Sequence, residues 1–303
     1  MRRLTLKRKS ALVLSVLLFF VFLVFFDAFD DETQQVDYDF EVGAMETRLH
    51  ALDGAADRLV RVPANSRRFL RNWANARFVE CLNLRVQREG TKQKIPLSAW
   101  NEAVELRDLL DQNDVTMFLL GGTLLGEFHH SDCSTRLLQC GLIPHTRDLD
   151  FALHSSELTA GLVRKVEGKH RLKHKLGELE DSFELTTWLA GVQTDLFVVY
   201  PLNGTHSYTT VVDFGRRKRT LAAVYPRISG LCTGLLLGAL VHVPCNVPEV
   251  LEADYGPNWR EDRSSADYSY LKAPNLAPFL EHTDEEFEQR MTILCRCFWF
   301  VCW

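Results

Sequence analysis

The chain has 303 residues, of which 46% are hydrophobic and 25% are charged, the balance of a globular protein with one or two domains and a sizeable core. Its formal net charge is −5, and leaving out five cations near the N-terminus reduces the 35 basic residues to 30, against 40 acidic ones. Nucleic-acid affinity comes largely from neutralising phosphates with basic side chains. The acidic balance therefore excludes nucleic acid as the expected partner.

The N-terminal segment predicts a membrane anchor. Five cations precede an apolar run that occupies 11–26 and extends, after Asp27, to Phe29, and acidic residues follow it. The run lies near the lower end of the roughly 17 to 25 residues that span a bilayer. A cleavable signal peptide is the alternative, but the A-x-A cleavage pattern of such peptides is missing. We therefore expect a cytoplasmic tail at 1–10 and an uncleaved signal-anchor transmembrane helix at 11–29, with the remaining chain in the lumen as a type II protein.

A lumenal chain meets oxidising conditions, and two sequence features bear on that setting. Eight cysteines can form disulfides there, although the sequence leaves their pairing open. No C-x-x-C motif occurs, which argues against a zinc site. The sequon Asn203-Gly204-Thr205 lies between expected secondary-structure elements, so Asn203 is the predicted glycosylation site.

The chain after the anchor divides into a stem, a domain and a tail. Residues 30–75 are acidic, then basic, with weak periodicity, and we interpret them as a lumenal stem with some helix or as a plain linker. A folded domain is expected at 76–276, followed by an atypical tail at 277–303.

Apolar periodicity within that domain predicts an α/β fold. Residues 98–112 carry apolar side chains at helical spacing, and 115–120 form a short apolar run that ends at a glycine pair. The segments 149–153 and 194–200 resemble two more buried strands, and 155–168 a helix between them with a serine near its N-cap. Strands and helices that alternate in this way are typical of the α/β class.

Three aspartates fall at predicted strand positions. Asp148 and Asp150 belong to RDLDFAL and project from one face, because alternate strand residues face the same way. Asp195 belongs to the later strand TDLFVVY. Like charges on one face repel and favour a cation, and carboxylate oxygens suit a hard divalent ion such as Mg²⁺ or Mn²⁺. We predict that Asp148 and Asp150 bind this metal, and that Asp195 either completes the ligand set or orients an attacking hydroxyl as a base.

The glycine pair predicts a complementary phosphate site. Gly121 and Gly122 allow backbone N–H groups to approach a phosphate closely, and Thr123 begins a segment expected to turn helical. A D-x-D or a G-G alone is a weak signal, more often found in surface or turn. The order of strand, G-G, helix, D-x-D and a further strand aspartate is much more specific, and it favours a site for a phosphate and a metal.

Several sequence blocks, in one order, resemble the fukutin branch of the LicD-type phosphotransferases. They are GGTLLG, LIPHTRDLDFAL, LKHKLGELEDSFELTTW, TDLFVVY and VHVPCNVPEVLEADYGPNW, with ARFVEC upstream and LKAPN downstream. The resemblance runs from Ala76 to Asn275, about two thirds of the chain. It implies a nucleotidyltransferase-like mixed sheet with flanking helices, so that 76–276 is expected to be a LicD/fukutin-type catalytic domain.

The resemblance also implies an activity. Members of the family transfer an alcohol phosphate, such as ribitol 5-phosphate or phosphocholine, from a CDP donor to a sugar hydroxyl and release CMP. For this chain it implies a metal-dependent phosphotransferase of the Golgi membrane that uses CDP-ribitol or a related donor. Its acceptor would be a glycoprotein glycan of dystroglycan-type protein O-mannosyl glycosylation, and other Golgi glycosyltransferases are its expected complex partners. The family's functional positions match Asp148, Asp150, Asp195, Gly121, Gly122 and Thr123.

Other residues of these blocks carry further predictions. Lys173 and Lys175, with His174 between them, are candidates to hold the donor's diphosphate, since ammonium groups act as point charges toward phosphate; an exposed basic turn is the alternative. The segment PEVLEADYG, with Pro248 suited to a first helical turn and Gly256 to its end, is expected to serve packing. No role is assigned to Glu180, Asp181 and Glu184.

An insertion separates this chain from the family pattern. About nine residues, HSDCSTRLL, follow GEFH, where the resemblance implies an arginine, so that His129 or Arg136 takes its place. Cys133 and Cys140 lie at this insertion, either as a disulfide that closes a small loop or as free thiols.

Two further departures stand on either side of the predicted site. The resemblance implies an extra aspartate before the D-x-D pair, and Thr146 and Arg147 stand there instead; Arg147 either weakens metal binding or contacts phosphate. The last residues, MTILCRCFWFVCW, are unlike the family's tail and too short to span a bilayer. A membrane-surface contact, a buried strand and a mistaken gene model all stay open for them.

The alternative to an enzyme is a catalytically inactive Golgi scaffold that binds a glycan or a partner transferase. The retained aspartates favour the enzyme, whereas the insertion and Arg147 leave room for the scaffold. Binding of CDP compounds distinguishes the two, because a scaffold need not recognise the donor.

Overall fold

The computed structural model describes residues 72, 77, 93–129, 141–213, 219–261, 268–281 and 291–293. All of them belong to the unit that spans Ala55–Trp303. Within these residues no helix is long and apolar enough to cross a membrane. The anchor predicted at 11–29 and the insertion at 130–138 lie outside the described residues.

The described chain alternates helices and strands. The helices are α3 (Leu97–Asp111), α4 (Gly121–His129), α5 (Ala160–Lys169) and α6 (Val247–Tyr255), with 3-10 turns η1 (Ser155–Glu157) and η2 (Tyr270–Lys272). The strands are β1 (Phe118–Leu119), β2 (Asp148–His154), β3 (Arg171–Leu176), β4 (Glu184–Leu189), β5 (Val192–Pro201), β6 (His206–Asp213), β7 (Arg219–Pro226), β8 (Leu231–Leu236), β9 (Ala239–Pro244), β10 (Leu276–Glu281) and β11 (Met291–Ile293).

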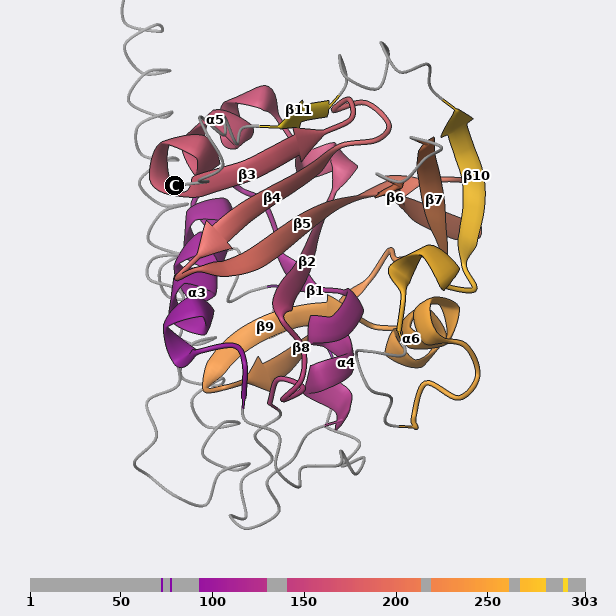
Figure 1. Ribbon diagram of the computed structural model, residues 1–303, viewed down its shortest axis with the longest axis horizontal. Coiled ribbons are helices and arrows are strands. Elements are labelled where there is room, and N and C mark those ends of the chain that lie inside the picture. Colours follow the sequence, from indigo (N-terminus) through magenta and orange to yellow (C-terminus); the bar gives the residue numbers. More distant parts are fainter. Residues whose placement is uncertain are drawn as a thin grey trace, which may run out of the picture. The chain divides into compact units, whose positions relative to one another are not determined.

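The strands that the structure describes join in one mixed sheet (Figure 1). Its main order is β10-β7-β6-β5-β2-β1-β9-β8, and β4, β3 and β11 extend it from the first half of β5. The pairs β2·β5 and β1·β9 are parallel, and the other pairs are antiparallel. A mixed sheet with flanking helices confirms the predicted α/β class.

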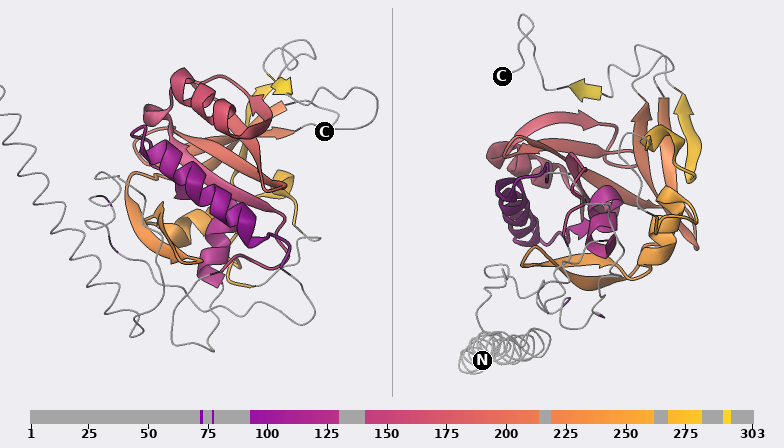
Figure 2. Two further views of the ribbon diagram at one scale, coloured as in Figure 1. Left: turned by 90° about the vertical axis from the view of Figure 1, so that its left-hand side faces the viewer. Right: turned by 60° about the horizontal axis from the view of Figure 1, so that its bottom comes forward.

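One face of the central strands forms the core. Leu149, Phe151 and Leu153 alternate along β2 and are at most 1% exposed. The helices α3 and α5 lie side by side over this face (Figure 2), and Trp100 of α3 stacks on Phe151 with ring centroids 6.4 Å apart. Burying one such side chain stabilises the fold by about 1.5–3 kcal/mol. The even-numbered positions of β2 must then face the other side, which is where the aspartates lie.

Two tight hairpins complete the sheet around this core. Ala190 and Gly191 both have positive φ, 43° and 80°, the requirement of a two-residue turn that suits the twist of antiparallel strands, and they join β4 to β5. Leu237 and Gly238, at 47° and 75°, join β8 to β9 in the same way. The second hairpin also carries a disulfide between Cys232 and Cys245, which settles one pairing that the sequence left open.

Several boundaries differ from the sequence predictions. The strand predicted at 115–120 is only Phe118–Leu119, and α4 begins at Gly121, so the glycines open the helix instead of forming a separate turn. Helix α5 begins at Ala160, and its cap is the Thr159 side chain, which accepts from the Leu162 amide at 3.2 Å. The predicted serine cap was therefore wrong, because the serines form the preceding 3-10 turn.

The sheet also extends past residue 276. Strand β10 pairs with β7, and β11, which begins the unusual apolar tail, pairs with β3. The first three residues of that tail are thus a strand, and 294–303 lie outside the described residues.

Candidate functional site

The three predicted aspartates meet on the face of the sheet opposite α3 and α5. Asp148 and Asp150 alternate along β2, and Asp150 is the register partner of Asp195 on the parallel strand β5. One carboxylate oxygen from each lies within 4.8 Å of the others. The structure therefore brings together residues that are 47 positions apart in the sequence.

The glycine pair closes against Asp150. The Gly122 amide donates to Asp150 Oδ2 at 2.8 Å, and the Asp150 amide donates to Thr123 Oγ1 at 2.8 Å. A Cβ atom at Gly121 would lie 2.9 Å from Asp150 Oδ2, and one at Gly122 would lie 3.1 Å from it. Gly121 also has φ +51°, a left-handed conformation that L side chains rarely adopt. The close approach of the Asp150 carboxylate therefore accounts for both glycines. Their predicted contact with phosphate stays a prediction.

The residues before Asp148 divide between site and solvent. The Thr146 hydroxyl donates to Asp148 Oδ1 at 3.2 Å, and the Arg147 side chain is exposed. Thr146, and not the exposed Arg147, therefore orients the Asp148 carboxylate.

Burial and neighbouring negative charges disfavour the charged forms of Asp150 and Asp195. Burial raises the pKa of Asp150 well above its ordinary value, and the charges of Asp148 and Asp195 raise it further, whereas the Gly122 hydrogen bond lowers it. Burial also raises the pKa of Asp195, against the hydrogen bonds donated by Thr186 and Gln193, which lower it. A divalent cation would favour the ionised carboxylates by supplying the missing opposite charge.

The two predicted lysines lie on strand β3, not in an exposed turn, and have different surroundings. Lys173 Nζ donates to Gln193 Oε1 at 2.5 Å and lies 5.6 Å from the Trp188 ring centroid. Its charge lowers the pKa of Asp195, so it lies in the electrostatic neighbourhood of the cluster. Lys175 instead forms an ion pair with Glu167 of the helix α5, which packs on the core face. Lys173 is the lysine that the structure brings toward the aspartates.

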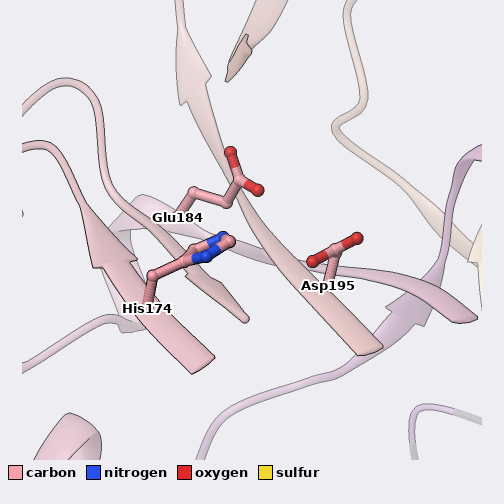
Figure 3. A group of neighbouring side chains, drawn as sticks. All are labelled: His174, Glu184 and Asp195. Carbon is pink, nitrogen blue, oxygen red and sulfur yellow. The ribbon is translucent and has the colours of Figure 1, made fainter. Parts of the chain in front are cut away.

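A second group of side chains adjoins Asp195, and the sequence analysis did not predict this group. His174, Glu184 and Asp195 come from the neighbouring strands β3, β4 and β5 and turn toward one another (Figure 3). A β-bulge in β3 between Leu172 and His174 makes His174 the partner of Thr186. Glu184 alternates with Thr186 along β4 and so shares its face, and the pairing of Thr186 with Asp195 makes this the aspartate face.

Helix α6 contributes a fourth aspartate that was predicted to serve only packing. Asp254 is 6% exposed and accepts a hydrogen bond from Asn275 Nδ2 at 3.0 Å. Its charge raises the pKa of Asp150. Asp254 is spaced from the buried Val247, Val250 and Leu251 as residues on one face of a helix are. This spacing could have predicted from the sequence that Asp254 is buried.

The chemistry of this donor set fits a divalent cation. The oxygens come from carboxylates that are close, half-buried or buried, and mutually repulsive, and oxygen ligands of this kind suit Mg²⁺ and Mn²⁺. Asp148 and Asp150 would hold the ion, with Asp195 completing the set. The predicted phosphate-binding glycines adjoin the same carboxylates, so metal and phosphate would share one location.

Comparisons with known proteins show which sequences this chain resembles. No family model matches the sequence. Two uncharacterized proteins of Caenorhabditis elegans are 32% and 33% identical, each over 69% of this chain and over 54% and 55% of their own lengths. The Mus musculus ribitol-5-phosphate transferase FKTN, or fukutin, is 27% identical over 236 residues, which are 72% of this chain and 47% of that protein. The sequence is fukutin-like.

The fukutin-like relationship has a defined extent. The chain spans about half the length of the curated relatives it matches. The fukutin relatives are named as ribitol-5-phosphate transferases. The wider LicD relationship, predicted from the sequence blocks, stays a prediction.

Proposed function

We propose that this chain is a metal-dependent phosphotransferase that moves ribitol 5-phosphate, or a related alcohol phosphate, from a CDP donor to a glycoprotein glycan. The observation that carries the proposal is the meeting of Asp148, Asp150 and Asp195 beside the Gly121-Gly122 helix start. The similarity to ribitol-5-phosphate transferases supports the choice of transferred group.

The reaction is a displacement at phosphorus. The oxygen of a sugar hydroxyl bonds to the phosphorus that carries the alditol, the bond from that phosphorus to the CMP oxygen breaks, and the hydroxyl proton passes to solvent. Such transfers depend on positioning and on neutralising oxygen charge, so no Ser or Cys nucleophile is needed. A bound divalent cation would supply the charge for the phosphate oxygens of the donor.

The chain's own residues have distinct parts in this proposal. Asp148, whose carboxylate accepts from Thr146, and Asp150, whose carboxylate accepts from the Gly122 amide and whose own amide donates to Thr123, would hold the cation. Lys173 adds positive charge near the cluster for the donor's diphosphate. Lys175 has no such part, because Glu167 already pairs with it.

The cellular setting is part of the proposal. We place the enzyme in the Golgi membrane as a single-pass type II protein, with glycosylation at Asn203 and with other Golgi glycosyltransferases as partners. The disulfide Cys232–Cys245 supports an oxidising compartment. Asn203 supports the glycosylation prediction, because it is exposed in the turn between β5 and β6.

A CMP-release assay on the purified full-length chain tests the function. CDP-ribitol, CDP-glycerol and CDP-choline are each supplied with Mg²⁺, Mn²⁺ or EDTA, with and without a candidate glycan acceptor. We expect release from one donor that requires both metal and acceptor. Absence of release, together with no thermal shift from any donor plus metal, would reject the enzyme and leave the scaffold interpretation.

A further inference from the structure

We propose a second divalent-cation site, formed by His174, Glu184 and Asp195, that takes a transition metal such as Mn²⁺ or Zn²⁺. Asp195 would bridge it to the site at Asp148 and Asp150. The proposal rests on geometry and donor chemistry, and it would stand even if the transfer reaction were different.

The three ligand atoms are already assembled. One ring nitrogen of His174 and one carboxylate oxygen each from Glu184 and Asp195 lie within 4.8 Å of one another. Ligands about 2.0–2.2 Å from a metal lie at most about 4.4 Å apart, so a small side-chain adjustment closes the site. Figure 3 shows the three side chains converging from adjacent strands.

Hydrogen bonding explains two of the three residues. The single Thr186 hydroxyl proton goes to Asp195 Oδ1 at 2.5 Å, so the contact of 2.6 Å between Thr186 Oγ1 and His174 Nε2 has the imidazole as donor. A neutral imidazole is the form of histidine that ligates metals.

Glu184 is the residue that hydrogen bonding leaves unexplained. Its side chain is only 9% exposed, and it points at Asp195 and His174. No side chain or amide in the described part of the protein donates a hydrogen bond to its carboxylate. A buried carboxylate without a hydrogen-bond donor is costly, and here Asp195 lies beside it, with Lys173 as the nearby positive charge. A cation at this point satisfies both.

The donor set distinguishes this site from its neighbour. The Asp148 and Asp150 side offers oxygen alone, which suits Mg²⁺ or Mn²⁺, whereas a site with an imidazole nitrogen suits a transition metal such as Zn²⁺ better than Mg²⁺. One divalent ion together with Lys173 would leave one negative charge uncompensated among the four carboxylates, Asp148, Asp150, Glu184 and Asp195. A second ion sharing Asp195 would compensate it.

Pulsed EPR of Mn²⁺ bound to the full-length chain tests the site directly, because nitrogen coordination gives a ¹⁴N coupling. Excess Mg²⁺ is added to occupy the oxygen-only site. We expect one Mn²⁺ with ¹⁴N coupling per chain, lost in His174→Gln. Glu184→Gln, which keeps the side-chain shape, should weaken Mn²⁺ binding at least about tenfold, since losing even an outer partner of a ligand costs about 10–100-fold in affinity.

Matched variants separate this site from the proposed function. His154→Gln removes another histidine of the same sheet face and should keep the coupling, and Asp148→Asn with Asp150→Asn should keep it while CMP release is lost. Circular dichroism of each variant checks folding. A wild-type chain without ¹⁴N coupling, or coupling that persists in His174→Gln, would overturn the proposal and leave Glu184 as a protonated buried carboxyl.

Discussion

Asp150 and Asp195 are register partners on the parallel strands β2 and β5. This pairing places a carboxylate from each strand on the same face, and Asp148, two residues before Asp150, joins them. The glycine-opened helix α4 then closes against Asp150 through the Gly122 amide. The candidate site is thus a product of strand register and of one close backbone approach.

Gly121→Ala should destabilise the fold and displace Asp150. A left-handed φ costs a non-glycine residue about 1–2 kcal/mol, and the added Cβ would press on the Asp150 carboxylate at 2.9 Å. We expect the free energy of unfolding to fall by about 2 kcal/mol or more. Gly168→Ala is the matched control: it lies in α5 with nothing within 4 Å of the added Cβ, and should gain about 0.5–1 kcal/mol. Urea unfolding of both variants checks this, and equal effects would count against the close approach.

Asp254→Asn should remove a pH dependence of stability. Burial raises the pKa of Asp254 from 3.8 to about 7, so between these pH values the folded chain retains a proton that the unfolded chain loses. Stability from this group is full below pH 3.8 and is lost as the pH rises toward 7, by about 1.4 kcal/mol per pH unit. The wild-type chain should therefore weaken relative to the variant over that range in urea unfolding. Parallel pH profiles would show that Asp254 is ionised in the folded chain.

Thr186→Val should affect the site more than its neighbour does. The variant keeps the shape but removes the hydroxyl between His174 and Asp195, which we expect to cost about 1–3 kcal/mol and to lower CMP release. Thr187→Val, on the opposite face, loses only a bond to the Arg171 carbonyl and should leave release unchanged. Equal release by both variants would show that Thr186 does not position the cluster.

Replacing Cys232 and Cys245 together by Ala should destabilise the β8–β9 hairpin. The disulfide closes a loop with a sequence separation of 13, for which chain entropy gives about 3 kcal/mol. A reducing agent should lower the wild-type melting temperature by more than it lowers that of the variant. A variant that responds equally to the reductant would place the relevant disulfide elsewhere.

The sequence predicted the parts of the site that lie within continuous patterns. Alternation along RDLDFAL put Asp148 and Asp150 on one face, and apolar spacing predicted α3, because both periods follow from local geometry. The glycine pair was located correctly, but its close approach to Asp150 depends on tertiary contact and could not be deduced.

The hairpins were missed because their turns lack the usual residues. Two-residue turns with positive φ favour Asn-Gly or Asp-Gly, whereas Ala190 and Leu237 occupy the first positions here. Without the β4–β5 hairpin, nothing placed Glu184 beside Asp195. Glu184 and His174 therefore became candidates only when the strand register was known.

The central claim is that the aspartate cluster carries metal-dependent phosphotransfer, and Asp148→Asn tests it most directly. The substitution keeps the side-chain shape and removes one charge, and Asp114→Asn makes the same change at an exposed position with φ 61°, a conformation that Asn tolerates. With CDP-ribitol, acceptor and Mn²⁺, we predict that CMP release is lost in Asp148→Asn and retained in Asp114→Asn, with both variants folded. Undiminished release by Asp148→Asn would contradict the account.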